Sequence, residues 1–483
     1  MARLIVGPFN RVEGDLEIAL DIADGAVRSA RVNAVLFRGF EQILAGKAPL
    51  DALVIAPRIC GICSVSQSVA SASALAQAMG LERPRNGELA TNLILACENL
   101  ADHFTHFYLF FMPDFTRDVY RDEAWFKGAA ARFAAVRGSA AADSLATRAG
   151  FLRLLGYLAG KWPHTLTLQP GGSARAIEAA EKLRIFALLR EFRGYLEQKM
   201  FGDALESVAA LSSEAELAAW AAGRAPGSSD LRMFLEIADA LGLEGLGRAT
   251  DQFISYGAYR VGGGALFPQG RWRAGELLPL VPEEIAEDLS HSWMSGPEVP
   301  LPPVSGVTHP APDKDGAYSW CKAPRLGGEV VETGALARQM VSGHRLIRDL
   351  VQRHGSNVKN RVIARLLELA LVVPRMEEWT RSLAPGDPFC HHGGMPEETF
   401  GVGMVEAARG SLGHWLAVSS GRIANYQIVA PTTWNFSPRD AGGTPGAVEQ
   451  ALIGAPVRTG ESTPVAVQHV VRSFDPCMVC TVH

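Results

Sequence analysis

The sequence predicts an α+β fold that is mainly α, with a central bundle of long helices, an N-terminal β-hairpin and irregular loops. Two patterns carry this prediction. Long segments in the middle of the chain repeat apolar residues at the three- and four-residue spacing of helices, whereas the first forty residues read as strands. The chain has 483 residues, 48% of them hydrophobic, which suffices for a sizeable core. Because no linker or internal repeat interrupts it, we expect residues 1–483 to form a single interwoven domain.

The N-terminal strands are predicted by two apolar runs around a turn. Residues 16–22 (LEIALDI) and 26–37 (AVRSARVNAVLF) flank the pair Asp24-Gly25. Asp-Gly between two such runs is typical of a tight hairpin turn. The sequence therefore predicts a hairpin at the start of the chain.

Helical patterns dominate after this hairpin. Residues 64–79 are rich in Ala and Ser and are followed by Gly80, a residue typical of helix C-termini. Further helices are predicted over 88–112, 173–201, 334–352 and 356–383. The Gly- and Pro-rich stretch 256–312 is expected to be irregular, and the last hundred residues to mix loops with short strands.

The charge balance excludes some classes of partner. The chain has 46 Lys and Arg against 51 Asp and Glu, a net charge of −5. This near balance gives no indication of binding to nucleic acid or to an anionic membrane. The N-terminus lacks the apolar run of a signal peptide, and the most apolar stretch, 104–113, is too short to span a bilayer. We expect a cytoplasmic protein without membrane insertion, although export on the signal of a partner stays open.

The cysteines are the strongest chemical signal. Four of the seven form two Cys-x-x-Cys pairs at opposite ends of the chain, Cys60 with Cys63 and Cys477 with Cys480. The first pair opens the helix predicted over 64–79, where the helix dipole favours thiolates. Four thiolates suit zinc, an iron–sulfur cluster or nickel. A structural zinc site is the common interpretation of such pairs, but zinc-binding pairs normally lie much closer together in sequence.

Both cysteine motifs, RICGIC and DPCMVCTVH, resemble the signature motifs of the large subunit of [NiFe]-hydrogenases. The resemblance covers the whole chain and includes, in order, RVEG (11–14), FRGFE (37–41), HFY (106–108), YSWCKAPR (318–325), GALAR (334–338), ARGSLGHW (408–415) and APTTWNFSPRD (430–440). A related subunit of respiratory complex I has this fold but lacks the cysteines. Their presence here favours a metal-bearing hydrogenase.

The resemblance implies a nickel–iron centre that cleaves H2 reversibly. Cys60 and Cys477 would be terminal thiolates on nickel, and Cys63 and Cys480 would bridge nickel to an iron that carries carbon monoxide and cyanide. Arg58 would hydrogen-bond a cyanide or pair with a carboxylate. Because no cysteines are left for iron–sulfur clusters, the electrons require a small subunit that carries them. We expect its docking face near Cys60 and Arg58.

The resemblance also implies a magnesium ion bound by Glu41 and by His483, the last residue. Many members of the family carry a C-terminal extension that is removed after nickel insertion during maturation. We therefore expect a chain that ends at His483 to be either the processed form or a protein for which no extension is encoded.

Four further residues match positions that handle protons and H2 in this family. Glu13 matches a glutamate that relays protons from the nickel cysteines, a task that suits a carboxylate of tunable pKa beside a thiolate. Arg409 matches an arginine over the open side of the metals, and Asp102 and Asp475 match the carboxylates that hold it. Ala408 stands where the family normally has a proline.

Three positions resemble the H2-sensing, regulatory branch of the family. Gln67 stands four residues after Cys63, where most members have histidine, and it is expected to lie beside that thiolate and to donate a hydrogen bond. Ile62 and Phe110 are bulky residues at gas-channel positions, and their bulk should narrow the path for O2 more than for H2. The sequence therefore favours a sensor of low turnover over an uptake enzyme that feeds electrons to respiration. Such a sensor would be a heterodimer, or a dimer of heterodimers, that signals to a partner such as a histidine kinase.

Overall fold

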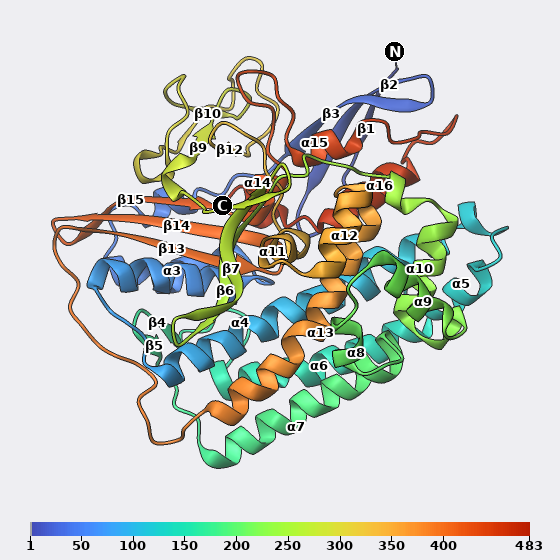
Figure 1. The fold of residues 1–483 in the computed structure, drawn as a ribbon. Coiled ribbons are helices and arrows are strands. Elements are labelled where there is room, and N and C mark those ends of the chain that lie inside the picture. The colour runs from blue at the N-terminus through green and yellow to red at the C-terminus, as the bar shows by residue number, and fades with distance from the viewer. Residues whose placement is uncertain (1) are drawn as a thin grey trace.

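The N-terminal segment forms a three-stranded antiparallel sheet. The structure, a computed structural model, describes residues 2–483 (Figure 1). Asp24 and Gly25 have positive φ angles of 54° and 71°, the conformation of the tight turn predicted there. The hairpin is thus confirmed and gains one more strand at its edge. The order of strands is β1 (Ala2–Val6), β2 (Leu16–Ala23) and β3 (Ala26–Ala34).

A bundle of four long helices fills the lower half of Figure 1 and confirms the predicted fold class. Two of them continue into π-helical turns, at His106–Phe111 and at Leu196–Met200. The four helices are α4 (Arg85–Thr105), α6 (Ser139–Ala159), α7 (Ala179–Tyr195) and α13 (Val358–Ser382). Apolar spacing does not predict α6, because most residues of its first half are Ala, Ser or Thr.

Two predictions about the second half of the chain are wrong in part. The helix expected over 334–352 is two helices, α11 (Ala335–Ser342) and α12 (Arg345–His354), because the chain turns at Gly343 with a φ angle of 83°. The start of the stretch expected to be irregular is an antiparallel sheet, whose alternation is masked in the sequence by several glycines. Its strands are β6 (Phe253–Val261), β7 (Gly264–Arg273) and β8 (Glu276–Leu278).

Helix α3 (Ser64–Met79) lies directly on the C-terminal sheet (Figure 1). It has the predicted bounds and ends at Gly80, whose φ angle is 63°. Its backbone touches the sheet because Gly401 and Gly403 carry no side chain; a Cβ at Gly403 would lie 1.8 Å from a carbonyl oxygen of the helix. The strands are β13 (Thr399–Ala407), β14 (Gly410–Ser419) and β15 (Arg422–Val429).

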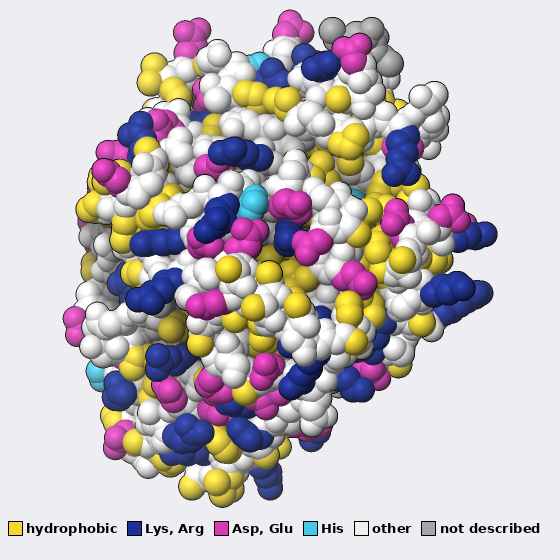
Figure 2. Space-filling model, turned by 45° about the vertical axis from the view of Figure 1, so that its right-hand side comes forward, with side chains coloured by type: hydrophobic (Ala, Val, Ile, Leu, Met, Phe, Trp, Pro, Cys, Tyr) yellow, Lys and Arg dark blue, Asp and Glu magenta, His cyan; other side chains and the backbone are white. Residues whose placement is uncertain are grey.

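Shorter elements connect these layers. The helices among them are α1 (Phe40–Leu44), α2 (Ala52–Ile55), α5 (Phe126–Phe133), α8 (Leu205–Ala209), α9 (Glu214–Ala222), α10 (Asp230–Ala240), α14 (Pro431–Asn435), α15 (Ala447–Leu452), α16 (Val465–Phe474) and α17 (Met478–Thr481). Within residues 2–483, no helix has the length and apolarity that crossing a membrane requires. On the face shown in Figure 2, side chains of both charges are interspersed with apolar ones.

The two ends of the chain meet inside the molecule. Buried apolar residues from Val6 to Val482 belong to one hydrophobic core. Glu13 pairs with Cys477 as in a parallel sheet, and the N–H of Met478 donates to the Glu13 carbonyl oxygen at 2.7 Å. This pairing places the segment around Glu13 beside the last cysteine motif.

Candidate metal centre

Four cysteine sulfurs converge where the two chain ends meet. All four are buried, and their sulfur atoms lie within 4.8 Å of one another. The sulfurs of Cys60 and Cys477 are 3.6 Å apart, close to the roughly 3.8 Å expected of two thiolates on one tetrahedral metal with bonds of about 2.3 Å. The sulfurs of Cys63 and Cys480 are only 2.9 Å apart, which suits a pair that is shared by two metals. The donor set therefore fits the predicted dinuclear centre.

The thiols alone cannot all ionise in this environment. Burial raises the pKa of the Cys480 thiol well above its usual range, whereas hydrogen bonds with the neighbouring cysteines, Cys477 first, lower that of Cys60. Four buried thiolates without a cation would be strongly unfavourable. A soft cation between the sulfurs removes this conflict, since thiolates are its preferred ligands.

Two residues that the sequence does not single out hold the motifs together. The Arg38 guanidinium donates to the carbonyl oxygen of Ile59 at 2.6 Å and also to that of Val479, so it joins the first motif to the last. The Thr432 hydroxyl accepts a hydrogen bond from the Cys477 N–H at 3.1 Å. Both residues lie in segments that carry the family resemblance, which is the one signal in the sequence that points to them.

Glu13 lies where a proton relay would need it. Its backbone pairs with that of Cys477, and its carboxyl is half-buried. Burial raises the pKa of this carboxyl, and the nearby Cys60 sulfur raises it further, while Arg409 opposes the shift. A carboxyl whose pKa is moved towards neutrality beside a thiolate can both accept and release protons.

Arg409 is presented to the sulfurs by a tight turn. Ala407 and Gly410 pair across the β13–β14 hairpin, so Ala408 and Arg409 form its two-residue tip. The Arg338 guanidinium donates to the carbonyl oxygens of Ala407 and Ala408 at 2.8 and 3.2 Å. These bonds hold the turn in place without the proline that the family has before the arginine.

The carboxylates predicted to hold Arg409 do so. Its Nη2 donates to Asp102 at 3.1 Å and to Asp475 at 3.2 Å, and its Nε donates to the Asp475 carbonyl oxygen at 2.8 Å. The remaining nitrogen, Nη1, is buried and has no hydrogen-bond partner among residues 2–483. The positive charge of Arg409 interacts with the sulfurs of Cys477 and Cys63. The guanidinium therefore keeps one donor and its charge available at the centre.

The structure corrects two expectations near the first motif. Arg58 is exposed, because the 3₁₀ turn Ala56–Ile59 buries its other three residues and turns Arg58 outward, so it does not belong to the buried centre. The Gln67 amide nitrogen approaches the sulfur of Cys480 at 3.7 Å rather than that of Cys63. Cys63 is the N-cap of α3 and has a non-helical ψ angle of 33°, so the four-residue stacking of a helix does not apply to this pair.

The two residues predicted for the gas channel are half-buried. Ile62 packs against the hydrophobic core between the first two cysteines. Phe110 lies in the π-helical turn His106–Phe111 that follows α4, and its carbonyl oxygen accepts a hydrogen bond from Arg11. Their role in gas access stays a prediction.

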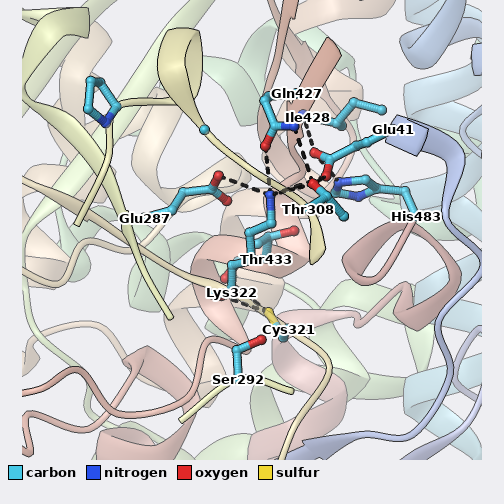
Figure 3. A network of polar contacts seen from close by, with 12 residues as sticks. Glu41, Glu287, Ser292, Thr308, Cys321, Lys322, Gln427, Ile428, Thr433 and His483 are labelled. Atoms are coloured by element: carbon cyan, nitrogen blue, oxygen red, sulfur yellow. Dashed lines mark hydrogen bonds and ion pairs between the residues drawn. The ribbon is translucent and has the colours of Figure 1, made fainter. Parts of the chain in front are cut away.

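A second polar cluster surrounds the C-terminal residue (Figure 3). His483 Nε2 lies 3.1 Å from the Glu41 carboxylate, and the Lys322 ammonium lies between Glu41 and Glu287 at 3.1 and 3.4 Å. Burial would raise the pKa of the Glu41 carboxyl, but Lys322 and His483 lower it to about 2. The two carboxylates share the Lys322 ammonium, and burial raises the pKa of the Glu287 carboxyl in spite of it. A further cation would therefore stabilise the ionised form of Glu287.

The space for that cation is present. A cavity of about 10 Å³ is lined by Glu41, Glu287, Lys322 and His483 among others, close to the volume that one water molecule needs. The second carboxylate oxygen of Glu287 is buried without a hydrogen-bond partner in the described chain. Carboxylate oxygens are the preferred ligands of Mg²⁺. Glu41 and His483 therefore fit the predicted magnesium site, with Lys322 and Glu287 beside it.

Removal of a cation bound at this site should loosen the C-terminal tail. We expect a chelator to lower the unfolding temperature of the wild-type protein, by an amount equivalent to about 2–3 kcal/mol if free Mg²⁺ was present at roughly 100 times its dissociation constant. His483→Ala should have the lower unfolding temperature even without the chelator and should respond little when the chelator is added. His392→Ala, at an exposed histidine, is the control and should behave like wild type. Equal responses of His483→Ala and wild type would place the cation elsewhere.

Together, four converging thiolates, a charged arginine and a carboxyl at the join of two chain ends define a buried soft-metal enzyme centre. A family model described as nickel-dependent hydrogenase matches residues 38–131 and 139–483. The chain belongs to this family and is a nickel-dependent hydrogenase.

Large subunits of known hydrogenases are similar in sequence to this chain over nearly their whole length. The periplasmic [NiFeSe] hydrogenase large subunit of Desulfomicrobium baculatum is 30% identical over all of this chain and 95% of its own. The uptake hydrogenase large subunit of Azotobacter chroococcum is 29% identical with the same coverage. Among solved structures, the oxidised Ni-Fe-Se hydrogenase of D. vulgaris Hildenborough superimposes with a TM-score of 0.87 at 29% identity, covering all of both chains. The chain is a hydrogenase large subunit by these similarities, and its mainly helical fold is theirs.

Proposed function

We propose that this chain cleaves H2 at a nickel–iron centre held by Cys60, Cys63, Cys477 and Cys480. The observation that carries the proposal is the convergence of these four buried sulfurs within 4.8 Å. When bound, the two metals supply Lewis acidity that polarises H2 for heterolytic cleavage. Cys63 and Cys480, whose sulfurs lie closer together than those of Cys60 and Cys477, would be the thiolates that both metals share.

The protein moves the proton and places the charge. A cysteine thiolate of the centre accepts the proton of H2, and Glu13, paired through its backbone with Cys477, receives it next. Arg409 keeps a buried positive charge and a free donor at the same sulfurs, held by Asp102 and Asp475. Because these groups are fixed before the substrate arrives, little reorganisation is needed during the reaction.

The electrons are proposed to leave through an iron–sulfur small subunit. The segment before the first cysteine motif supports a docking face there. Arg58 and Gly61 are exposed next to Cys60. Four exposed apolar side chains precede them, and the interfaces of permanent complexes are more hydrophobic than the rest of a protein surface. They are Leu36, Ile43, Leu50 and Val54.

In the cell, we propose that the chain works as a catalytic uptake enzyme. The relatives that resemble it over their whole length are named as uptake and periplasmic hydrogenases. A cytoplasmic location stays a prediction. The test is H2-dependent dye reduction by the purified complex with its small subunit. We expect steady turnover that disappears in Cys477→Ser, and a matured, nickel-loaded complex without turnover would contradict the proposal.

A second candidate is an H2 sensor, favoured by Gln67 in place of the usual histidine. Glutamine cannot be protonated, so it offers the neighbouring Cys480 sulfur only a neutral hydrogen bond. The histidine that most members have at this position can carry a positive charge. Deletion of the gene separates the two candidates. A sensor is expected to alter transcription of other hydrogenase genes in response to H2, whereas an uptake enzyme is expected to alter only H2 consumption.

The sensor interpretation also predicts tolerance to O2. Replacement of Ile62 by Val and Phe110 by Leu should widen the gas channel, with a stability loss of about 1–3 kcal/mol from the smaller side chains. We expect the wild-type complex to keep its H2 oxidation activity after prolonged exposure to air and the double variant to lose it. Equal survival would make these residues ordinary packing, and rapid inactivation of the wild type would count against the sensor.

A further inference from the structure

Behind the metal centre, three buried polar side chains form a continuous hydrogen-bonded chain that ends on a cysteine sulfur. The Tyr426 hydroxyl lies 2.7 Å from His414 Nδ1, and His414 Nε2 lies 2.7 Å from the Gln67 amide oxygen. The Gln67 amide nitrogen approaches the Cys480 sulfur at 3.7 Å. All three side chains are at most 1% exposed. Neither His414 nor Tyr426 has a role in the mechanism above.

We propose that Tyr426 and His414 are positioning residues that fix the Gln67 amide as a hydrogen-bond donor to Cys480 and thereby tune how strongly this thiolate donates electrons to the bound metals. The proposal rests on the proposed function, because it concerns the thiolate as a metal ligand. Partners behind a metal ligand are known to orient the ligand and to adjust the properties of the metal.

The chemistry of the three groups sets the direction of every bond. An amide oxygen only accepts, so His414 Nε2 must carry a proton and donate it to Gln67. Burial lowers the pKa of His414 to about 3, so the ring is neutral and its Nδ1 has a lone pair for the Tyr426 hydroxyl. The Gln67 –NH2 group then faces Cys480. If the amide were turned around, its oxygen would meet a negatively charged sulfur.

The resulting chain of donors points one way, from Tyr426 to the metal centre. Hydrogen bonds in such a row polarise one another in a buried, low-dielectric environment. Loss of the Tyr426 hydroxyl would leave the Nδ1 lone pair of His414 buried without a donor, so the ring would no longer be anchored on that side. A ring that shifts or turns to satisfy this nitrogen weakens the hydrogen bond from its Nε2 to the Gln67 oxygen. The Gln67 amide would then no longer be held in the orientation in which it donates to Cys480.

The fold brings these residues together through two glycines. Gly403 is paired in register with His414 on the neighbouring strand. Gly401 and Gly403 are also the residues whose missing side chains let α3 lie against the sheet. Gln67 is one turn into α3, and its N–H donates to the Cys63 carbonyl oxygen at 3.1 Å. The close approach of helix and sheet therefore sets the distance between Gln67 and His414.

The test is infrared spectroscopy of the carbon monoxide and cyanide bands in the nickel-loaded complex with its small subunit. A hydrogen bond withdraws electron density from a thiolate. Its loss should therefore increase the electron density at the metals and move the carbon monoxide band to lower wavenumber. We expect shifts of a few cm⁻¹ in Tyr426→Phe and in His414→Leu, in the direction of the shift in Gln67→Leu. His414→Gln keeps a donor towards Gln67 and should restore most of the wild-type position.

A matched control separates this effect from the loss of any buried hydroxyl. Tyr256→Phe removes the hydroxyl of another fully buried tyrosine, in β6, and its bands should stay at the wild-type position. The proposal is overturned if the bands of Tyr426→Phe lie where those of Tyr256→Phe lie while the bands of Gln67→Leu are shifted. Gln67 would then keep its orientation without Tyr426. If His414→Leu fails to take up metal, Tyr426→Phe decides, because it removes one oxygen atom. Absence of the diatomic bands from nickel-loaded wild type would instead refute the proposed nickel–iron centre.

Discussion

Glu13→Gln should abolish most H2/D⁺ exchange while the metal centre still assembles. The substitution keeps the shape of the side chain but removes the acid, and general acid–base groups typically contribute 10²–10⁴-fold to rate. We therefore expect a loss of at least about 100-fold in exchange per nickel. Glu13→Asp keeps the acid but moves it back by one methylene, and should give an intermediate rate.

The control for this substitution is nearby in the chain. Asp15 is an exposed carboxylate two residues further on, and Asp15→Asn should exchange at the wild-type rate. Exchange that stays normal in nickel-loaded Glu13→Gln would mean that protons leave the cysteines by another route. In that case the pairing of Glu13 with Cys477 is only structural.

Arg409→Lys should lower H2 oxidation about 10²–10³-fold, the usual effect of losing one fixed donor at a reacting centre. Lysine keeps the positive charge but loses the planar guanidinium, whose Nε donates to the Asp475 carbonyl oxygen while its Nη2 contacts Asp102 and Asp475. Its ammonium therefore has no fixed place at the sulfurs. Rates are compared per bound nickel, so that any loss of assembly is counted separately.

Arg422→Lys, at an exposed arginine that begins β15, is the matched control and should keep full activity. If Arg409→Lys is as active as this control, positive charge alone suffices and the fixed geometry of the guanidinium has no role in catalysis. A variant that binds no nickel would make Arg409 part of assembly rather than of H2 cleavage.

Local pattern was enough to predict several elements of the structure. The Ala- and Ser-rich run before Gly80 predicts the bounds of α3 correctly, because a helix former and a helix stop lie side by side. The two Cys-x-x-Cys pairs predict the four sulfurs, since cysteines at this spacing have few other uses in a reduced protein. The family resemblance correctly places Asp102 and Asp475 around Arg409.

Other features depend on contacts between distant segments and have no local signal. Arg38 and Val479 are 441 positions apart, and Gln67 and His414 are 347 apart. The turn of Arg58 to the surface and the contact of Gln67 with Cys480 follow from backbone geometry at the first motif, where residues 56–63 are not α-helical. Residue types and spacing alone do not determine such geometry.

The nickel content of the purified complex tests the central claim most directly. Elemental analysis of the matured protein with its small subunit should give one nickel per large subunit, and Cys477→Ser should reduce this content to background. Stoichiometric zinc without nickel in the matured wild-type complex would contradict the account, since the four sulfurs would then hold a structural metal.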